Sequence, residues 1–397
     1  MTEQSLTGLG TGLGGAAGLA GDDASAVFYN PAAMTLRPGS QLQAGLTYIE
    51  VKAEFRGASS CAAAGACAPG PHADGGSGSL VPHGYAATAL AERLWLGVGV
   101  NVPFGLQSDY GRRWVGRYHA VESRLQTIDL NPVAAWRLSD WLAAGAGFSV
   151  QYADATLSQA VFTGTPADGF AEVSGDDIAY GFNAGLMVQP GDTTRLGVSY
   201  RSAIDYTLAG DFTVSGLPGP LAARNGTVPA EAGLTLPETV FLSGWQRITQ
   251  RWAVAAAARW TRWSRFDALR VVNAASGSVL ALTPQDWNDS WGVTLGVHYA
   301  YSPAWTFRAG LAYDQTPIPD AARRTPRIPD GDRRWLAVGA SYRPGDNLTV
   351  DLGYTHLFID NNDIDNTIPL APGLADRLTG RVDIDSDAAG VQVNWRF

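Results

Sequence analysis

The chain has 397 residues, a formal net charge of -9 and only 16% charged residues. A nucleic-acid binder needs a basic face to neutralise phosphates, so this charge balance argues against nucleic-acid partners. Aromatic residues make up 10% of the chain, a share that argues against disorder. No run of about 18 or more apolar residues exists, so no transmembrane helix is predicted, although strands of about 9–11 residues can also cross a membrane.

The first 40 residues are glycine-rich and show no strand alternation. Met1 is followed by the polar run TEQSLTG and not by a signal peptide, which predicts a mature chain with an initiator Met. Gly10, Gly12 and Gly15 satisfy the G-x-G-x-x-G spacing of a dinucleotide-binding turn. That turn follows a buried strand within a parallel α/β unit, and neither is present here. No nucleotide or other cofactor is therefore expected.

The two cysteines, Cys61 and Cys67, lie in the loop-like run CAAAGAC. His72 alone adds too few ligands for a metal site, so none is expected. A local disulfide, which implies an oxidising compartment, is favoured over two free thiols. Mass spectrometry without reductant distinguishes the two states.

From about residue 40 the dominant pattern is strict alternation of apolar and polar residues. In the last strand the apolar face consists of Val391, Val393, Trp395 and Phe397. Apolar faces of this kind often begin or end in Trp or Tyr, and the opposite faces are small or polar. Aromatic ends of an apolar band suit the two interfaces of a membrane, and a small, polar inner face suits a lumen.

About fourteen such segments are predicted, an even number that fits an outer-membrane barrel. Their approximate limits are 40–55, 81–94, 95–110, 122–138, 141–157, 178–190, 194–214, 234–248, 252–271, 280–301, 305–315, 333–343, 348–359 and 386–397. Short turns alternate with long connections, which are 56–80, 158–177, 215–233, 316–332 and 360–385. No blade-sized repeat of a propeller is found. The predicted fold is all-β, a 14-stranded antiparallel transmembrane β-barrel.

A barrel of about fourteen strands encloses a lumen too wide for side chains alone to fill. Something must plug it, and the first 40 residues are the part without strand alternation. The expected domains are an N-terminal plug over 1–40 and the barrel over 41–397.

Several stretches, in order along the chain, resemble the FadL family of outer-membrane transporters of long-chain fatty acids and other hydrophobic compounds. They are GLG…GDDASAVFYNPAAM (8–34), NVPFGL (101–106), WVGRYHAVES (114–123), WLAAGAGFSVQYADA (141–155), TRLGVSYRS (194–202), LTLPETV (234–240), WTRWSRFD (260–267), WTFRAGLAYDQTPIPD (305–320), RTPRIPDGDRRWLAVG (324–339) and Phe397. The resemblance implies a barrel plugged by an N-terminal "hatch" whose motif is Asn30, Pro31 and Ala32. The plain alternative is that Asn30 and Pro31 form a simple turn.

Glycines on the inner strand faces would let a plug approach the wall, because glycine has no Cβ. These are Gly97, Gly99, Gly145, Gly147, Gly181 and Gly185.

The stretch NVPFGL interrupts the third strand. Pro103 cannot donate to a ladder and Gly105 packs nothing, so a bulge or gap in the wall is expected here. The alternative is that Pro103 ends the strand at the rim. The resemblance implies a lateral opening at Pro103, Phe104 and Gly105, through which substrate leaves into the outer leaflet.

The resemblance also implies capture between the loops 158–177 and 215–233. The candidates are Val161, Phe162, Phe170, Leu217 and Leu221, which could equally pack the two loops together. A fatty-acid carboxylate in a deeper, hatch-lined pocket would need an Arg. By alternation Arg201, Arg259 and Arg308 point inward, where each could instead pair with Asp22, Asp23, Asp129, Asp314 or Asp351.

The expected function is passive uptake of hydrophobic molecules across the outer membrane of a Gram-negative bacterium, by a monomer in contact with membrane lipid and lipopolysaccharide. A general porin is the alternative, and an enzyme or adhesin on a barrel scaffold is the third. The five histidines form no H-x-H or H-E-x-x-H motif, and no G-x-S-x-G exists. The acidic run DNNDIDN (360–366) lacks the Gly and distal Glu of a calcium loop.

Overall fold

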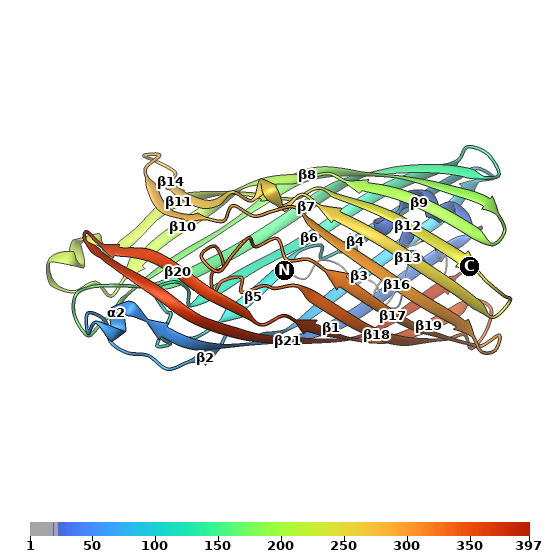
Figure 1. The fold of residues 1–397 in the computed structure, drawn as a ribbon. Coiled ribbons are helices and arrows are strands. Elements are labelled where there is room, and N and C mark those ends of the chain that lie inside the picture. The colour runs from blue at the N-terminus through green and yellow to red at the C-terminus, as the bar shows by residue number, and fades with distance from the viewer. Residues whose placement is uncertain (1–18, 20–22) are drawn as a thin grey trace.

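The computed structural model describes Leu19 and residues 23–397, which form an elongated β-barrel (Figure 1). Most of the expected plug, including Gly10, Gly12, Gly15 and Asp22, lies outside the described residues. No helix in the described part of the chain has the length and apolar character needed to cross a membrane.

Fourteen antiparallel wall strands make up the barrel. The continuous strands are β1 (Ser40–Ser59), β3 (Ser77–Ala91), β6 (Glu122–Arg137), β7 (Leu142–Val161), β8 (Gly169–Gly191), β17 (Trp305–Asp314), β18 (Arg333–Tyr342), β19 (Leu348–Ile359) and β21 (Leu374–Arg396). The others are each interrupted: β4 (Leu94–Asn101) with β5 (Gly105–Asp109), β9 (Thr194–Arg201) with β10 (Ile204–Ser215), β11 (Gly226–Leu236) with β12 (Thr239–Arg247), β13 (Trp252–Thr261) with β14 (Ala268–Asn273), and β15 (Val279–Pro284) with β16 (Ser290–Ala300). The short elements outside the wall are β2 (Ala73–Asp74), β20 (Asn362–Ala371), α2 (Ser60–Ala63), η2 (Gly219–Arg224) and η3 (Trp263–Arg265).

The first and last strands close the barrel. β1 pairs with β21 from Gln41↔Arg396 to Ser59↔Leu378, and on its other side with β3 from Ser40↔Thr88. In hydrocarbon every backbone N–H and C=O needs an internal partner, so a membrane-spanning sheet must close in this way.

The alternation predicted from the sequence separates the two faces of the wall. In β19, Leu352 and Tyr354 stand exposed on the outside, whereas Asp351 is buried. Aromatic side chains cluster on the outside near the short turns, where Trp305 lies 4.7 Å from Tyr342 between ring centroids. The predicted alternation of short turns and long connections is also visible in Figure 1, with the short turns at the right-hand end.

The expected loop limits are wrong where wall strands continue beyond the apolar band. β7 and β8 pair as far as Val161↔Gly169, so most of the expected loop 158–177 is a hairpin. β11 likewise begins at Gly226 within the expected loop 215–233, and β1 continues to Ser59. The expected loop 360–385 contains β20 paired with β21. The alternation marks where a strand is half-buried in lipid, and it fades where both faces meet water or other loops.

The described N-terminal residues lie against the inner wall. The helix α1 (Ala26–Tyr29) and the 3₁₀ helix η1 (Pro31–Leu36) are almost entirely buried. Val27 and Met34 share a hydrophobic cluster with side chains of the wall strands β3, β4, β6, β7, β8, β12 and β13. These strands come from a large part of the circumference, so the segment lies inside the barrel near the short-turn end (Figure 1).

Candidate functional site

A break in the third wall strand lies at the predicted position. β4 ends at Asn101 and β5 begins at Gly105, and Phe104 lies in the interruption. The backbone N–H of Phe104 donates to Thr127 Oγ1 of β6 at 2.9 Å, and the N–H of Thr127 donates to the Phe104 carbonyl at 3.2 Å. The chain resumes as a strand after Pro103, so this proline does not end the strand at the rim.

Among the described residues no strand ladder forms on the other side of the break, where only single hydrogen bonds cross, such as that from the Asp109 N–H to the Gly75 carbonyl at 3.2 Å. The β3–β4 ladder ends at Gly84↔Val100, and β5 pairs only with β6 among the described strands. The part of β3 from Ser77 to His83 is therefore bonded to β1 alone. Side chains span the resulting gap, because Ser79 Oγ donates to Gln107 Oε1 at 3.2 Å. Opening these contacts disrupts fewer backbone hydrogen bonds than opening a strand ladder would.

A cavity of about 980 Å³ occupies this gap. Its lining includes Ser79 and Leu80 of β3 and Gly105 of β5. A Cβ added at Gly105 would meet no atom within 4 Å, so this glycine borders open space. Phe104 turns inward instead and packs edge-on against Trp263, with 6.1 Å between ring centroids.

Two further cavities continue from the gap into the barrel. The first, of about 690 Å³, shares Gly105, Leu106 and Gln107 with the gap cavity. The second, of about 770 Å³, shares Leu106, Arg327 and Ile328 with the first. The lining of the second cavity is mainly apolar: Leu106, Leu125, Leu157, Val173, Leu208, Ala230, Leu234, Phe266, Leu269, Val271 and Ile328. The shared residues place the three cavities next to one another, from the apolar interior to the wall.

Arg327 lies where these inner cavities meet. Its guanidinium donates to the Glu122 carbonyl at 3.2 Å, to Ser123 Oγ at 3.1 Å and to Gln159 Oε1 at 2.8 Å. It forms no ion pair with any carboxylate of the described residues. Burial lowers the pKa of Arg327 to about 10, so it stays charged at neutral pH. A partly buried cation without an acidic partner can bind an anion.

The three arginines predicted from alternation point inward but are each paired with an aspartate. Arg201 lies 3.2 Å from Asp129, and Arg259 lies 2.8 Å from Asp314. Arg308 lies 3.4 Å from Asp351. Of the three, Arg259 borders a separate cavity of about 520 Å³ next to Tyr29. Pairing with an aspartate is the alternative to ligand binding that the sequence analysis gave for these three arginines. Arg327 was not among the predicted site residues. The sequence feature that could have identified Arg327 is its position within the otherwise apolar run PRIP (326–329).

The expected hatch motif is fixed to the wall. Asn30 is fully buried, and its Oδ1 accepts from the N–H of Ala32 at 3.1 Å. Its Nδ2 donates to the Leu186 carbonyl of β8 at 3.1 Å. Pro31 occupies the first turn of η1, where its missing N–H costs nothing. Asn30 therefore both caps the helix and attaches it to the barrel.

Glycines of the wall leave room for this motif. A Cβ at Gly185 would lie 2.1 Å from Asn30 Oδ1, and one at Gly145 would lie 2.7 Å from Pro31 Cβ. Gly97 and Gly99 face Val27 in the same way. The other two glycines of the predicted set, Gly147 and Gly181, make room for wall side chains instead: Val133, Asn183, Ile204 and Ser202.

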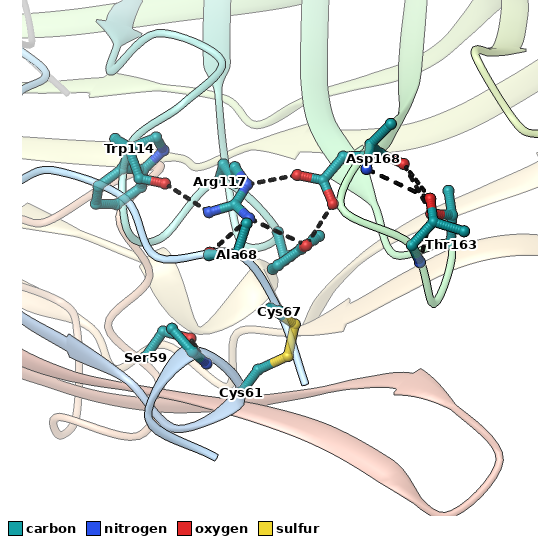
Figure 2. Close-up of polar contacts among 12 residues, drawn as sticks. Ser59, Cys61, Cys67, Ala68, Trp114, Arg117, Thr163 and Asp168 are labelled. Atoms are coloured by element: carbon teal, nitrogen blue, oxygen red, sulfur yellow. Dashed lines mark hydrogen bonds and ion pairs between the residues drawn. A yellow bond between two sulfur atoms is a disulfide. The ribbon is translucent and has the colours of Figure 1, made fainter. Parts of the chain in front are cut away.

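At the long-loop end, residues 114–121 form a buried segment that joins several outer loops. Figure 2 shows Arg117 between Asp168, which is 2.7 Å away, and the carbonyl of Ala68, which accepts at 2.9 Å. Cys61 and Cys67 form a disulfide next to it, with Cα atoms 5.2 Å apart. We call residues 60–68 and 114–121 the outer cap.

The predicted capture residues surround this cap and contribute to none of the cavities described above. Phe162 packs edge-on against Tyr118, and Arg112 lies over the ring of Phe170. Leu217 is buried, whereas Val161 and Leu221 are half-buried.

The cap also contains His119, whose Nε2 lies 3.4 Å from Asp376 Oδ2. Ser59 Oγ donates to the same aspartate at 2.7 Å. The aspartate lies between the serine and the histidine, whereas a catalytic triad needs the histidine in the middle. Among the described residues no group of three or more His, Cys, Asp or Glu could hold a metal ion.

A closed 14-stranded antiparallel barrel with an apolar outer band is the architecture of a bacterial outer-membrane protein. The chain belongs to the outer membrane protein transport protein family (OMPP1/FadL/TodX), which it matches over residues 1–397. Relatives in this family are transport channels and not enzymes.

Similar proteins cover nearly the whole chain. The long-chain fatty acid transport protein of Escherichia coli O6:H1 is 29% identical, over 90% of this chain and 86% of that protein. Outer membrane protein P1 of Haemophilus influenzae is 31% identical, over 90% of this chain and 85% of that protein. The crystal structure of a Pseudomonas aeruginosa FadL homologue superposes with a TM-score of 0.90 at 26% identity, covering 100% and 99% of the two chains. The Pseudomonas putida toluene transporter TodX shares the fold, with a TM-score of 0.72 at 18% identity and 94% of both chains covered.

Proposed function

We propose that this protein is a passive channel for long apolar molecules that carry a carboxylate, such as long-chain fatty acids, and that the molecule leaves sideways through the gap between β3 and β5. The observation that carries the proposal is the row of neighbouring cavities between the apolar interior and the wall, with Arg327 bordering the two inner ones. The name of the Escherichia coli relative, a long-chain fatty acid transport protein, supports this substrate class. The similarity to the toluene transporter TodX, at 18% identity, shows the fold and says nothing of the substrate.

The lateral exit has a physical rationale. An apolar tail that leaves through the wall enters the outer leaflet directly and does not cross the aqueous end of the lumen. The break fixed by Phe104 and the side-chain contacts of Ser79 support an opening at this point. Gly105 leaves open space beside it.

Residues 1–40 act as the hatch in this proposal. The buried contacts of Asn30 and the glycines that receive it support a plug that normally keeps the lumen closed. A general porin would need an open lumen, which the filled interior disfavours. Aromatic side chains near the short turns fit a protein in contact with membrane lipid, and we propose that it works as a monomer.

The test replaces Arg327 by Gln in a strain that lacks its own uptake protein. Uptake of a long-chain fatty acid is compared with uptake of its uncharged methyl ester. Because a hydrogen bond to a charged group contributes about 1.5–3 kcal/mol, R327Q is expected to weaken fatty-acid uptake by about 10- to 100-fold and to leave the ester unchanged.

The matched control is Arg323→Gln on the same loop, because Arg323 forms an exposed ion pair with Asp286. It should leave both rates unchanged. Equal loss for acid and ester, or no loss for either, would contradict recognition of a carboxylate by Arg327.

A further inference from the structure

The hairpin formed by β14 and β15 exposes apolar side chains on the long-loop side of the barrel. Val279 is 50% exposed and Leu282 is 57% exposed. The other exposed large apolar side chains of the described residues lie on the membrane-facing wall strands or beside the short turns. In Figure 1 the turn of this hairpin stands out from the barrel near the label β14. An exposed apolar patch of this kind can mark a binding site.

A bulge gives this hairpin two different faces. Val271 pairs with Ala281 and Val272 pairs with Val279, so Leu280 is the additional residue. Leu280 packs against the inner hydrophobic cluster, as does Leu269 of β14, which lines the apolar cavity of about 770 Å³. Val279 and Leu282 lie on the outer face. The hairpin therefore separates an exposed apolar patch from the apolar cavity by the thickness of one sheet.

The free edge of β15 connects the two faces. β15 pairs with β14 and with no other described strand. Movement around this edge would therefore break no strand ladder.

A cation lies beside the apolar patch. Arg270 is the cross-strand partner of Leu282, so the two side chains share the outer face. Arg270 is exposed and forms no ion pair with any described residue. An apolar surface next to a free guanidinium suits an amphiphile with an apolar tail and a carboxylate.

We propose that Arg270, Val279 and Leu282 form an entry site for long-chain carboxylates arriving from the medium, here called the hairpin patch. This inference rests on the proposed function, because the captured molecule is the one that the inner cavity holds. The entry site lies on the β14–β15 hairpin, apart from the loops around Phe162 and Leu221.

The test measures uptake of a long-chain fatty acid against its concentration for the wild type and for the double variant Val279→Ser/Leu282→Ser. Losing two exposed apolar contacts should raise the half-saturating concentration about tenfold and leave the maximal rate unchanged, because the inner cavity is intact. Leu374→Ser, at the turn of the β20–β21 hairpin, is the matched control, because Leu374 borders none of the cavities described above; it should leave the curve unchanged.

The outcomes separate the two levels of the proposal. If cells with the wild-type protein take up no more fatty acid than cells without it, the proposed function is contradicted. Wild-type uptake with an unchanged curve for the double variant overturns the hairpin patch alone.

A second measurement does not depend on the folding of the double variant. A photoreactive benzoylphenylalanine at position 282 should label a long-chain fatty acid added to whole cells, and one at position 374 should not. Labelling of lipopolysaccharide alone at position 282 would show that the hairpin contacts the membrane surface, and would overturn the entry site.

Discussion

Phe104 and Thr127 fix each other by reciprocal hydrogen bonds across the break in the third wall strand. The Thr127 hydroxyl accepts from the Phe104 N–H at 2.9 Å and donates to the Phe104 carbonyl at 2.8 Å. A hydroxyl is the smallest side-chain group that can do both. Beyond the end of the β3–β4 ladder, the Thr127 side chain therefore holds the broken strand in place. The position of Phe104 depends on this one residue of β6.

Replacing Thr127 by Val should weaken the break. The variant keeps the shape of the side chain but leaves the buried Phe104 N–H without this partner, at a cost of about 1–3 kcal/mol. We expect a barrel that still assembles, seen as a heat-dependent shift on a gel, with fatty-acid uptake reduced several-fold. Thr127→Ser, which retains the hydroxyl, should behave as the wild type, and an equal loss in both variants would contradict this role.

Closing the gap itself should stop uptake. In the double variant Pro103→Val/Gly105→Val, position 103 regains an N–H, and the new side chain at position 105 projects into the gap cavity, where nothing lies within 4 Å of a Cβ. Binding of fatty acid to the purified protein should persist, because Arg327 and the inner cavity are unchanged. Normal transport by this variant would remove the support for a lateral exit.

A Cβ at Gly185 should displace the hatch motif. In Gly185→Ala the new atom would lie 2.1 Å from Asn30 Oδ1, closer than any contact allows, so Asn30 must leave its site on β8. We expect larger and steadier ohmic currents in planar bilayers than for the wild type. Gly191→Ala, where a Cβ meets nothing within 4 Å, is the control and should conduct as the wild type.

The outer cap should lose stability in acid through Asp376. Burial raises the pKa of this carboxyl, but hydrogen bonds from His119, from the Cys61 N–H and from Ser59 outweigh it, and the net pKa is below the ordinary value. A lowered pKa in the folded state stabilises the cap above the ordinary carboxyl pKa of about 4, and this stability is lost as the pH falls through the lowered value.

Pepsin cleavage of the cap between about pH 2 and pH 5 measures this effect, since it follows the opening of the cap. Cleavage should increase toward low pH in the wild type. Asp376→Asn should be cleaved more readily throughout and with a weaker dependence on pH. The same pH profile in both proteins would rule out Asp376 as the titrating group.

The wall of the barrel could be predicted because lipid imposes a period of two on each strand. The sequence alone places Leu352 and Tyr354 on one face of the strand and Asp351 on the other. The apolar face then lies toward lipid and the polar face toward the lumen. The limits of the loops around 158–177 could not be predicted in this way. There the strands of the hairpin β7–β8 continue through water and loop contacts, where neither face has a fixed solvent.

The charged residues show the same division. Alternation correctly turned Arg201, Arg259 and Arg308 inward, but it could not indicate which of them meets an aspartate, because Asp129, Asp314 and Asp351 come from other strands.

The sequence by itself determined a membrane barrel, its family, the break at Pro103 and the inward side of each strand, because these depend on residues close together in the chain. Only the tertiary structure decided that Arg327 has no acidic partner among the described residues and that Asn30 fits against Gly185. The tertiary structure alone also showed that the ladder between β3 and β4 ends at Gly84. These depend on closure of the sheet, which brings residues far apart in the chain into contact and fixes which polar groups remain for a ligand.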